Sequence, residues 1–488
     1  MIQRSFSALL KDIFIYGIGD LFLKGSIFIT MPILTRLFSP EEYGTWGVLN
    51  TIVGIMTMIL ILGADSAYSR YYFEYRSQSE RQRLTSTCLI FLVIWTFLGV
   101  LVALLSVRQI SLLVFQTSNH WHLLAIALPG IPIALLNLIC SQALRNQFKA
   151  RLYAVLNLVS GLVGILFTII GVLFGGLSGI LVGTVLSAVV MLPVRLFSIR
   201  QLLILTFSWQ DLGFLLRYGV PLVPASIAYW VFQGSDRILL GRLSSLEQVG
   251  LFTVAATISG ILYMLSGVFS TAWNPHAIYI HESEPDRAPV VFGQMLRYII
   301  VCFGGLAVVL SVFAPELTGL LSDKRYVQAA AAVGPLTLAM VAQASIQVTA
   351  SGISLQKKTH YIMVLSWLAA FANLALNIVL MPKWGMIAAA WSTAVAYLLL
   401  SVSYFTVSQR LWPIIYSKAK LGIAIALVGG YTVFSAHFPE LGLAVGIMIK
   451  LCYCASFVIL LFLSGVLSQQ EWQYLIRFSF RNLTRRLN

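Results

Sequence analysis

The sequence predicts an all-α membrane protein with about 14 transmembrane helices, arranged as two six-helix lobes followed by two further helices. Three observations support this fold class. Hydrophobic residues make up 59% of the 488 residues and charged residues only 10%, with a mean hydropathy of +0.88. Apolar runs long enough to cross a bilayer follow one another along the whole chain. A charged stretch between the first two runs occurs a second time in the second half.

The apolar runs give the predicted spans once they are divided at charge clusters and at glycine or proline turns. Lipid offers no hydrogen-bond partners to the backbone, so each span must be helical. The N-terminal run lacks a signal-peptide cleavage site and is predicted to be an uncleaved first helix. The spans are expected at roughly residues 12–36, 44–64, 84–106, 120–144, 151–174, 176–197, 213–240, 249–273, 292–314, 328–354, 360–381, 385–409, 418–436 and 441–466.

The basic residues alternate between connections and so predict the orientation. If the N-terminus is cytoplasmic, most of the 32 lysines and arginines, Arg145 among them, fall in cytoplasmic connections. Positive charge is retained on the cytoplasmic side, so both termini are predicted to lie there. The net charge of +15 is therefore attributed to topology, and nucleic acid is not an expected partner. No connection is long enough for a soluble catalytic domain.

The repeated stretch reads LTRLFSPEEYGTW from Leu34 and LGRLSSLEQVGLF from Leu240. In each half it falls between the first two helices on the predicted outer side, where Ser39 or Ser245 can cap the second helix. The identical positions are Leu34/Leu240, Arg36/Arg242, Leu37/Leu243, Ser39/Ser245, Glu41/Glu247 and Gly44/Gly250. The phrase is expected to be mainly a well-formed hairpin.

The glycines that separate the fifth from the sixth and the eleventh from the twelfth helix, Gly176 and Gly385, also correspond. The predicted domains are residues 1–205 and 206–412 for the two lobes, 413–466 for two additional helices and 467–488 for a basic amphipathic cytoplasmic tail. Because each lobe has an even number of helices, the repeat is expected to be parallel, with the two lobes enclosing a cavity.

Charged side chains inside predicted spans are the candidate functional residues, because a charge at the bilayer centre costs roughly 2.5–3.5 kcal/mol and usually faces a cavity. Asp20 and Lys24 stand four residues apart on the first helix, with Tyr16 on the same stripe. Lys24 and Tyr16 are candidates for substrate binding, and Asp20 for gating or ion coupling. A neutralised pair that fixes the helix to its neighbours is the alternative.

Two further groups of charges stand near helix ends. Asp236 and Arg237 lie near the outer end of the seventh helix, with Arg242 just beyond, and are candidates for gating or ion coupling. An interfacial ion pair of little consequence is the alternative. Arg70 and Tyr71, at the inner end of the second helix, are candidate contacts for phosphate and sugar, since arginine matches phosphate geometry. An aromatic belt at the membrane interface explains them equally well.

Other residue types predict no catalytic chemistry. The five cysteines lie in separate apolar runs or on different helix faces, so neither a disulfide framework nor a metal site is expected. Nucleotide-binding, metalloprotease and serine-hydrolase motifs are absent from the sequence, and a protein that is not an enzyme and holds no cofactor is predicted. Amide side chains either line the cavity or bond helices together; they are Asn137, Gln142, Asn157, Gln343, Gln347, Asn373 and Asn377.

The residues from Leu34 to Tyr72, with the later runs YVQAAAAVGPLTLAM and LQKKTHYIMVLSWLAAFANLALNIVLMPKWGMIAAAWST, resemble the polysaccharide transporter branch of the multidrug/oligosaccharidyl-lipid/polysaccharide exporter superfamily. The resemblance covers most of residues 10–410 and departs where Met386 and Ile387 are followed by alanines with no second glycine. It implies a flippase that moves a polyprenyl-diphosphate-linked oligosaccharide, an O-antigen or exopolysaccharide repeat unit, across the bacterial inner membrane by alternating access. Arg36 and Arg242 would then flank the exit.

The same resemblance leaves two rivals of the same fold, a cation-coupled multidrug exporter and a flippase for the peptidoglycan lipid precursor. It implies the lipid-linked glycan and membrane lipids as partners, with a polysaccharide polymerase and a chain-length regulator as candidate protein partners. A polymerase or ligase is a less favoured function, because such enzymes carry a long periplasmic loop and this sequence has none.

Overall fold

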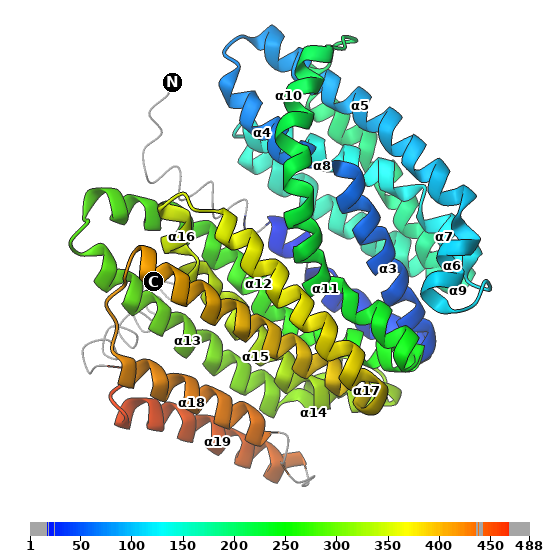
Figure 1. Ribbon diagram of the computed structural model, residues 1–488. Helices are drawn as coiled ribbons and strands as arrows, with labels where there is room; N and C mark the ends of the chain where they lie inside the picture. Colours follow the sequence, from blue (N-terminus) through cyan, green and yellow to red (C-terminus); the bar gives the residue numbers. More distant parts are fainter. Residues whose placement is uncertain (1–16, 18, 24, 436–437, 439–442, 468–488) are drawn as a thin grey trace, which may run out of the picture. The chain divides into compact units, whose positions relative to one another are not determined.

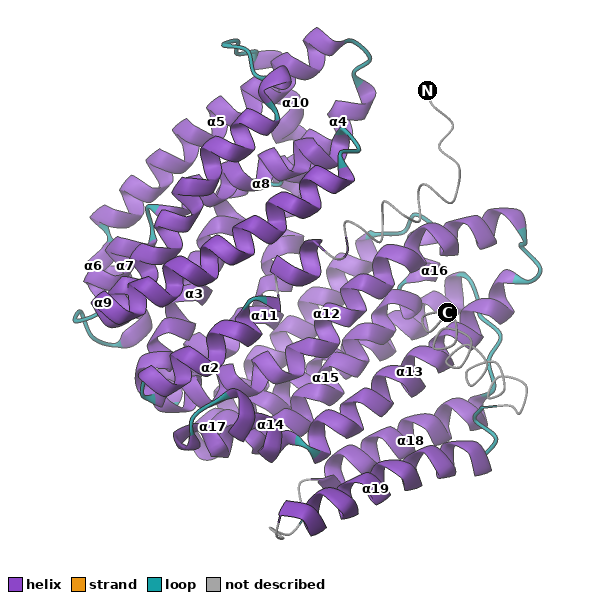
Figure 2. Cartoon of the chain, turned by 180° about the vertical axis from the view of Figure 1, so that it is seen from behind, coloured by secondary structure: helices purple, strands orange, loops and turns teal. Residues whose placement is uncertain are grey.

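The computed structural model describes residues 17–467 apart from 18, 24, 436–437 and 439–442. Every regular element in this part of the chain is a helix, and short turns join the helices (Figures 1 and 2). The prediction of an all-α fold is therefore confirmed.

Helical residues 19–23 precede the first helix whose bounds are defined. The helices are α2 (Ile27–Leu37), α3 (Pro40–Ile61), α4 (Ala64–Glu74), α5 (Gln78–Leu105), α6 (Val107–Phe115), α7 (Trp121–Ala127), α8 (Gly130–Asn146), α9 (Ala150–Ser198), α10 (Trp209–Gly219), α11 (Val223–Leu243), α12 (Leu246–Ser283), α13 (Ala288–Val312), α14 (Ala314–Leu321), α15 (Ala330–Thr349), α16 (Ser351–Leu355), α17 (His360–Leu411), α18 (Lys418–Phe434) and α19 (Leu443–Leu463), with 3-10 turns η1 (Arg200–Leu202), η2 (Val220–Leu222) and η3 (Lys324–Ala329).

Ten helical stretches in the described residues are long and apolar enough to cross a membrane. Two of them, α9 and α17, each contain a kink at a glycine with positive φ, Gly176 at 54° and Gly385 at 52°. Only glycine adopts this backbone readily, so each long helix holds two successive spans, as predicted. Together with α18 and the described helical residues up to the end of α2, the spans agree with the predicted fourteen. The protein is a multi-pass membrane protein.

The repeated stretch forms the helix start that its sequence predicts. Ser39 accepts a hydrogen bond from the backbone N–H of Glu42, and the Glu42 carboxylate accepts one from the backbone N–H of Ser39. Pro40 is the first residue of α3. In the second copy Ser245 accepts from the backbone N–H of Gln248. The helix after the first copy is longer than predicted, since the apolar stretch runs from Pro40 to Glu74 with only a short break between α3 and α4.

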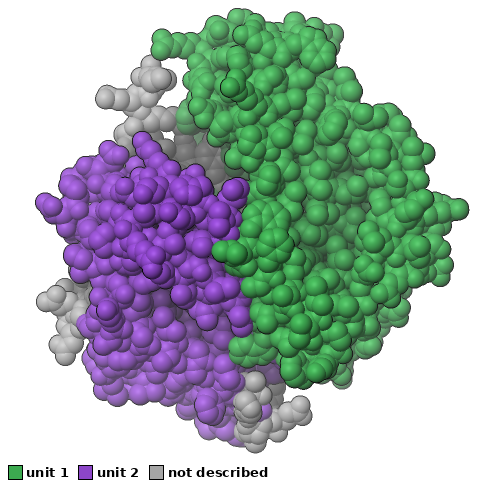
Figure 3. All heavy atoms as spheres, viewed as in Figure 1, with its two compact units in different colours: residues 1–257, 318–329, 366–392 green, residues 258–317, 330–365, 393–488 purple. Residues whose placement is uncertain are grey.

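The described chain forms two compact units, coloured separately in Figure 3. Unit 1 contains residues 1–257, 318–329 and 366–392, and unit 2 contains the remainder. This division follows contacts and does not test the repeat-based lobes, whose boundaries stay a prediction.

Unit 1 has a core formed by α4, α5, α8, α9 and α10, with buried residues such as Tyr68, Leu84 and Leu144. The connection that follows α9 is fastened to α5, because the hydroxyls of Ser86 and Thr87 accept hydrogen bonds from the backbone N–H groups of residues 204 and 208, at 3.0 and 3.1 Å. α10 packs beside α4 and α5 (Figure 1). Unit 1 therefore brings the start of the second predicted half against helices of the first.

Unit 2 has a core centred on α13 and α15, where Phe292, Ile300 and Val348 are buried. α18 and α19 run side by side along its edge (Figures 1 and 2). Lys450, in the middle of α19, is only 7% exposed and donates to Glu316 of α14 at 2.5 Å. An unpaired lysine inside a membrane-spanning helix would be costly. The ion pair with Glu316 therefore allows α19 to carry a charge within the bilayer.

Candidate functional site

Arg70 lies exposed on α4 beside three aromatic rings of unit 1. Its guanidinium pairs with Glu74 at 3.0 Å and stands 4.8 Å from the centre of the Tyr218 ring. The Tyr71 ring stacks on Phe214 of α10, with centroids 5.6 Å apart and planes 23° apart. The structure therefore places the predicted residues Arg70 and Tyr71 together and adds two aromatic residues from α10 that the sequence did not single out.

The neighbouring α8 extends this exposed polar surface. Ser66, Arg70 and Glu74 on α4 and Arg145 in the last turn of α8 are all exposed, although their helices belong to apolar, membrane-length stretches. Exposed charges of this kind are expected to face water and not hydrocarbon. We call these four residues the inner polar face, because the charge pattern predicts that they lie toward the cytoplasm.

Side-chain hydrogen bonds connect α8 with α4. Gln142 donates to the hydroxyl of Ser69, the residue before Arg70, and Arg145 donates to the side-chain oxygen of Gln142. The guanidinium of Arg145 also lies 5.6 Å from the centre of the Tyr153 ring on α9. Gln142 therefore bonds helices together, one of the two roles that the sequence left open for it.

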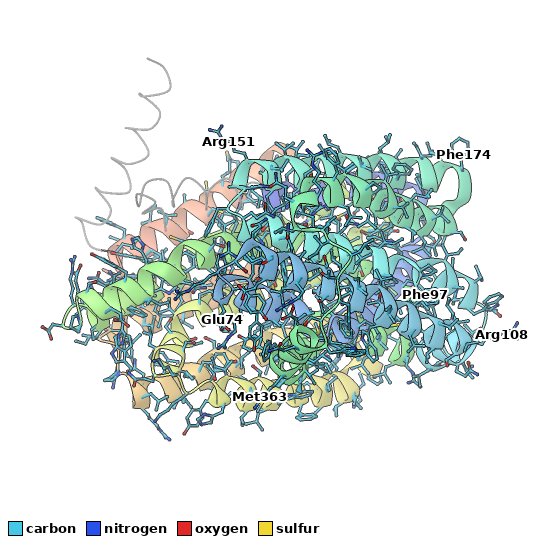
Figure 4. The ribbon with its side chains drawn as sticks, turned by 90° about the horizontal axis from the view of Figure 1, so that it is seen from above. Glu74, Phe97, Arg108, Arg151, Phe174 and Met363 are labelled. Carbon is cyan, nitrogen blue, oxygen red and sulfur yellow. The ribbon has the colours of Figure 1, made fainter. Side chains whose placement is uncertain are left out.

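Tyr153 contacts both Arg145 of the inner polar face and Asp20. Its hydroxyl donates to Asp20 Oδ1 at 2.6 Å, and Asn157, one turn further along α9, donates to the same oxygen at 3.1 Å. Tyr153 and Asn157 are buried, and Asp20 is half-buried. In Figure 4, Arg151 and Glu74 lie to the left of Arg108 and Phe174.

Arg195 is the cation of this network, and the sequence did not identify it as a candidate. It is 6% exposed, donates to Asn157 Oδ1 at 3.1 Å and to Ser160 at 2.8 Å, and also donates to Ser141. The Asn157 amide thus bridges Arg195 and Asp20. One positive and one negative charge offset each other within the bundle, which reduces the cost of burying both. A single arginine near the end of an apolar run gave no stronger signal than the other topology charges.

Asp236 occupies a second buried polar site in unit 1. It is 3% exposed, and its Oδ1 accepts a hydrogen bond from Asn377 Nδ2 at 2.5 Å. The same Asn377 nitrogen lies 3.2 Å from Asn373 Oδ1, while Asn377 Oδ1 is buried without a partner. A carboxylate beside amide oxygens is a donor set that suits a hard cation or a proton. The described residues contain no cluster of three His, Cys, Asp or Glu side chains that could hold a metal.

Arg237 is adjacent to Asp236, but its side-chain hydrogen bonds and ring contact are made with other residues. Its guanidinium donates to the backbone oxygen of Gln233 at 3.0 Å, lies 3.4 Å from Thr253 Oγ1 and stands 5.8 Å from the Phe252 ring centre. These contacts are with α11 and α12. An exchange of partners between Asp236 and Arg237 during gating stays a prediction.

The two copies of the repeated stretch contact each other. A Cβ atom at Gly44 would stand 1.8 Å from the backbone oxygen of Leu246, and one at Gly250 would stand 1.9 Å from that of Pro40. The first turns of α3 and α12 therefore meet backbone to backbone within unit 1. Such an approach requires glycine at both positions.

Arg36 and Arg242 flank this contact and expose their side chains. Their backbone oxygens accept hydrogen bonds, that of Arg36 from Arg325 at 3.0 Å and that of Arg242 from Gln116 at 3.1 Å. The guanidinium groups remain at the surface, which is compatible with the predicted exit role without testing it. Tyr16 and Lys24, the other predicted candidates on the first helix, lie outside the described residues.

A buried carboxylate secures the start of α10. Asp211 is fully buried and accepts hydrogen bonds from Arg83 at 2.7 Å and from the Tyr75 hydroxyl at 2.5 Å. Burial, together with the hydrogen bond to Asp211, raises the pKa of Tyr75 to about 12. Tyr75 therefore stays a hydrogen-bond donor at neutral pH. This cluster holds α4, α5 and α10 together at the predicted inner end.

Comparison with solved structures places this geometry in a known fold. The structure of the lipid II flippase MurJ in an inward-closed conformation matches with a TM-score of 0.71 at 14% identity, over 91% of this chain and 97% of that chain. An inward-facing multidrug resistance MATE family transporter of the MOP superfamily matches with a TM-score of 0.60 at 15% identity, over 82% and 94%. A mutant of the Vibrio cholerae MATE transporter VcmN also matches at 0.60 and 15%, over 83% and 97%.

The likeness to these structures, at such low identity, concerns the fold alone. No curated protein matches the sequence. The family model described as polysaccharide biosynthesis protein matches residues 9–281, more than half of the chain. The chain therefore belongs to the polysaccharide biosynthesis protein family, and it has the fold of MOP-superfamily flippases and transporters.

Proposed function

We propose that the protein is a flippase of the bacterial inner membrane, with both termini in the cytoplasm. Its substrate is a polyprenyl-diphosphate-linked oligosaccharide, an O-antigen or exopolysaccharide repeat unit, which it moves to the periplasmic leaflet by alternating access. Membership of the polysaccharide biosynthesis protein family supports the substrate class. The fold that it shares with MurJ, a lipid II flippase, supports the transport step.

The inner polar face is the observation that carries the proposal. Two exposed arginines stand beside aromatic rings on membrane-length helices, Arg70 beside the Tyr218 ring and Arg145 beside the Tyr153 ring. Guanidinium groups bind phosphate oxygens with matching geometry, and aromatic rings offer flat apolar surfaces to sugars. A diphosphate headgroup followed by a glycan combines both kinds of chemistry. Arg70 would bind the diphosphate, and Tyr71 would contact the sugar next to it.

The carboxylates of two aspartates are proposed as the coupling sites. Asp20 and Asp236 each accept a hydrogen bond from an asparagine on another helix, and uptake of a cation or proton would replace that bond. Arg237 and Arg242 would act in gating at the predicted outer side, with Arg36 at the exit. Lys24 and Tyr16 would add a cation and a hydroxyl to the substrate path.

A deletion strain tests the proposal directly. Loss of the protein should remove the surface glycan and cause undecaprenyl-linked repeat units to accumulate in the cytoplasmic leaflet. Complementation with Arg70→Gln should restore less surface glycan than complementation with the parent chain. Loss of the glycan without accumulation of the lipid-linked unit would contradict flipping, and loss of lipid II transport would instead assign the peptidoglycan precursor.

A cation-coupled multidrug exporter is the second candidate, because the carboxylates of Asp20 and Asp236 would also suit a transporter of cationic drugs. The two functions make opposite demands on the first helix. An exporter should depend on Asp20 and tolerate Lys24→Ala, whereas a flippase for an anionic headgroup should lose activity with Lys24→Ala. Surface glycan and drug resistance measured in the same pair of variants distinguish them.

A further inference from the structure

An arginine that only fixes membrane topology needs no side-chain partner, but Arg145 has two. Its side chain is exposed on the inner polar face, yet it donates to Gln142 and covers the face of the Tyr153 ring at 5.6 Å. A guanidinium free to point into water would give up both contacts. The side chain is therefore held between the exposed face and the buried network.

The contacts continue on both sides of Arg145. On one side, Gln142 bonds Ser69, which precedes Arg70 in the chain. On the other side, the Tyr153 hydroxyl donates to Asp20 at 2.6 Å. Four side chains in contact, Ser69, Gln142, Arg145 and Tyr153, thus lead from the exposed cationic surface to the Asp20 carboxylate inside a predicted span.

The two contacts of Tyr153 reinforce each other. A cation over the ring face withdraws electron density, which makes the hydroxyl a better donor to Asp20. The negative charge of Asp20 on the hydroxyl in turn makes the ring more attractive to Arg145. Anything that removes Arg145 from the ring weakens the bond to Asp20, and anything that neutralises Asp20 loosens Arg145.

We propose that Arg145 couples binding of a diphosphate headgroup on the inner polar face to the state of the Asp20 carboxylate. The inference rests on the proposed flippase function and adds a positioning role for Tyr153. A diphosphate draws the guanidinium of Arg145 away from Tyr153, and the bond between Tyr153 and Asp20 weakens. By linkage, a cation or proton on Asp20 frees Arg145 and strengthens headgroup binding.

A double-mutant cycle tests this coupling in the full chain reconstituted in lipid nanodiscs, with undecaprenyl diphosphate as the probe. Asp20→Asn should tighten binding about twofold to fivefold, the size of one exposed cation–π contact. Tyr153→Phe, which keeps the ring and removes the hydroxyl, should tighten binding similarly. Arg145→Lys keeps the charge but not the planar group. In a chain that carries Arg145→Lys, neither Asp20→Asn nor Tyr153→Phe should change the affinity for undecaprenyl diphosphate.

Arg70→Lys is the matched control, because the described contacts of Arg70 run to Glu74 and Tyr218 and not to Asp20. Its effect should add to that of Asp20→Asn. Equal effects of Asp20→Asn in the parent and in the Arg145→Lys chain would overturn the coupling while leaving the flippase proposal intact. If Asp20→Asn does not fold, Tyr153→Phe with Arg145→Lys decides the same question. No binding by the parent chain would overturn the proposed function and the coupling with it.

Discussion

Replacement of Gly250 by alanine tests the contact between the two copies of the repeated stretch. An alanine Cβ at this position would lie 1.9 Å from the backbone oxygen of Pro40 and 3.2 Å from the backbone nitrogen of Gly44. Neither atom belongs to a flexible side chain, so the first turns of α3 and α12 must separate. Gly260, further along the same helix, has nothing within 4 Å of its ideal Cβ and provides the control.

The magnitude follows from this geometry. An ordinary carbon–oxygen contact begins near 3.4 Å, so the backbones must move apart by roughly 1.5 Å. Overpacking of this kind costs about 1–3 kcal/mol. Both alanines gain up to about 1 kcal/mol of helix propensity, which cancels when the two variants are compared. At roughly 2 °C per kcal/mol for a chain of this size, Gly250→Ala should melt about 2–6 °C below Gly260→Ala.

Thermal unfolding of the purified variants in one detergent, at a fixed scan rate, measures this difference. Gly44→Ala should behave like Gly250→Ala, because its Cβ would lie 1.8 Å from the backbone oxygen of Leu246. Equal melting temperatures for Gly250→Ala and Gly260→Ala would refute the reasoning, since the helix starts could then separate at no cost.

Three further predictions concern the charged sites. Asp236→Asn should remove the dependence of transport on an imposed ion gradient in vesicles. It should shift the melting temperature by less than about 2 °C, because an asparagine oxygen still accepts the hydrogen bond from Asn377. Gradient dependence that persists would exclude Asp236 from coupling. Arg83→Gln should lower the free energy of unfolding by about 1–3 kcal/mol, because it leaves the fully buried Asp211 without its half-exposed cationic partner. Adding Asp211→Asn should recover part of that loss, and no recovery would argue against the pair. Arg70→Gln should weaken undecaprenyl diphosphate binding about tenfold through the loss of a charge-assisted contact; unchanged binding would place the headgroup elsewhere.

The sequence predicted the helices well because lipid imposes a simple requirement. A run of apolar residues must be helical in a bilayer, and the glycines at 176 and 385 mark the breaks where their positive φ is needed. Helix ends were less predictable. The second span continues to Glu74 because only two residues with left-handed backbone, Leu62 and Gly63, separate α3 from α4. Hydropathy gave no sign that the tyrosine-rich segment that forms α4 would be helical.

The site was only partly predictable. Asp20 and Asp236 stood out, because a carboxylate inside an apolar run is rare. The sequence named their partners Asn157 and Asn377 only as amides that line the cavity or bond helices, and it did not name Tyr153, since an asparagine or tyrosine in a membrane helix serves many purposes. Arg195 could not be told from charges that fix topology, because burial and not sequence position distinguishes them. The contact between the repeated hairpins was also hidden, since a repeat indicates equivalent positions but not whether they touch.

The repeat predicts that the two carboxylates stand at different depths on equivalent helices. Asp20 precedes Arg36 by sixteen residues, whereas Asp236 precedes Arg242, its repeat counterpart, by six. At 1.5 Å per residue the ten-residue difference corresponds to about 15 Å, half of a hydrocarbon core of about 30 Å. Each nevertheless bonds an asparagine of the fifth helix in its half, Asn157 or Asn377. The bond between Asn157 and Asp20 is predicted to lie near the inner side of the membrane, and the bond between Asn377 and Asp236 near the outer side. The two carboxylates should therefore respond to cations from opposite sides of the membrane.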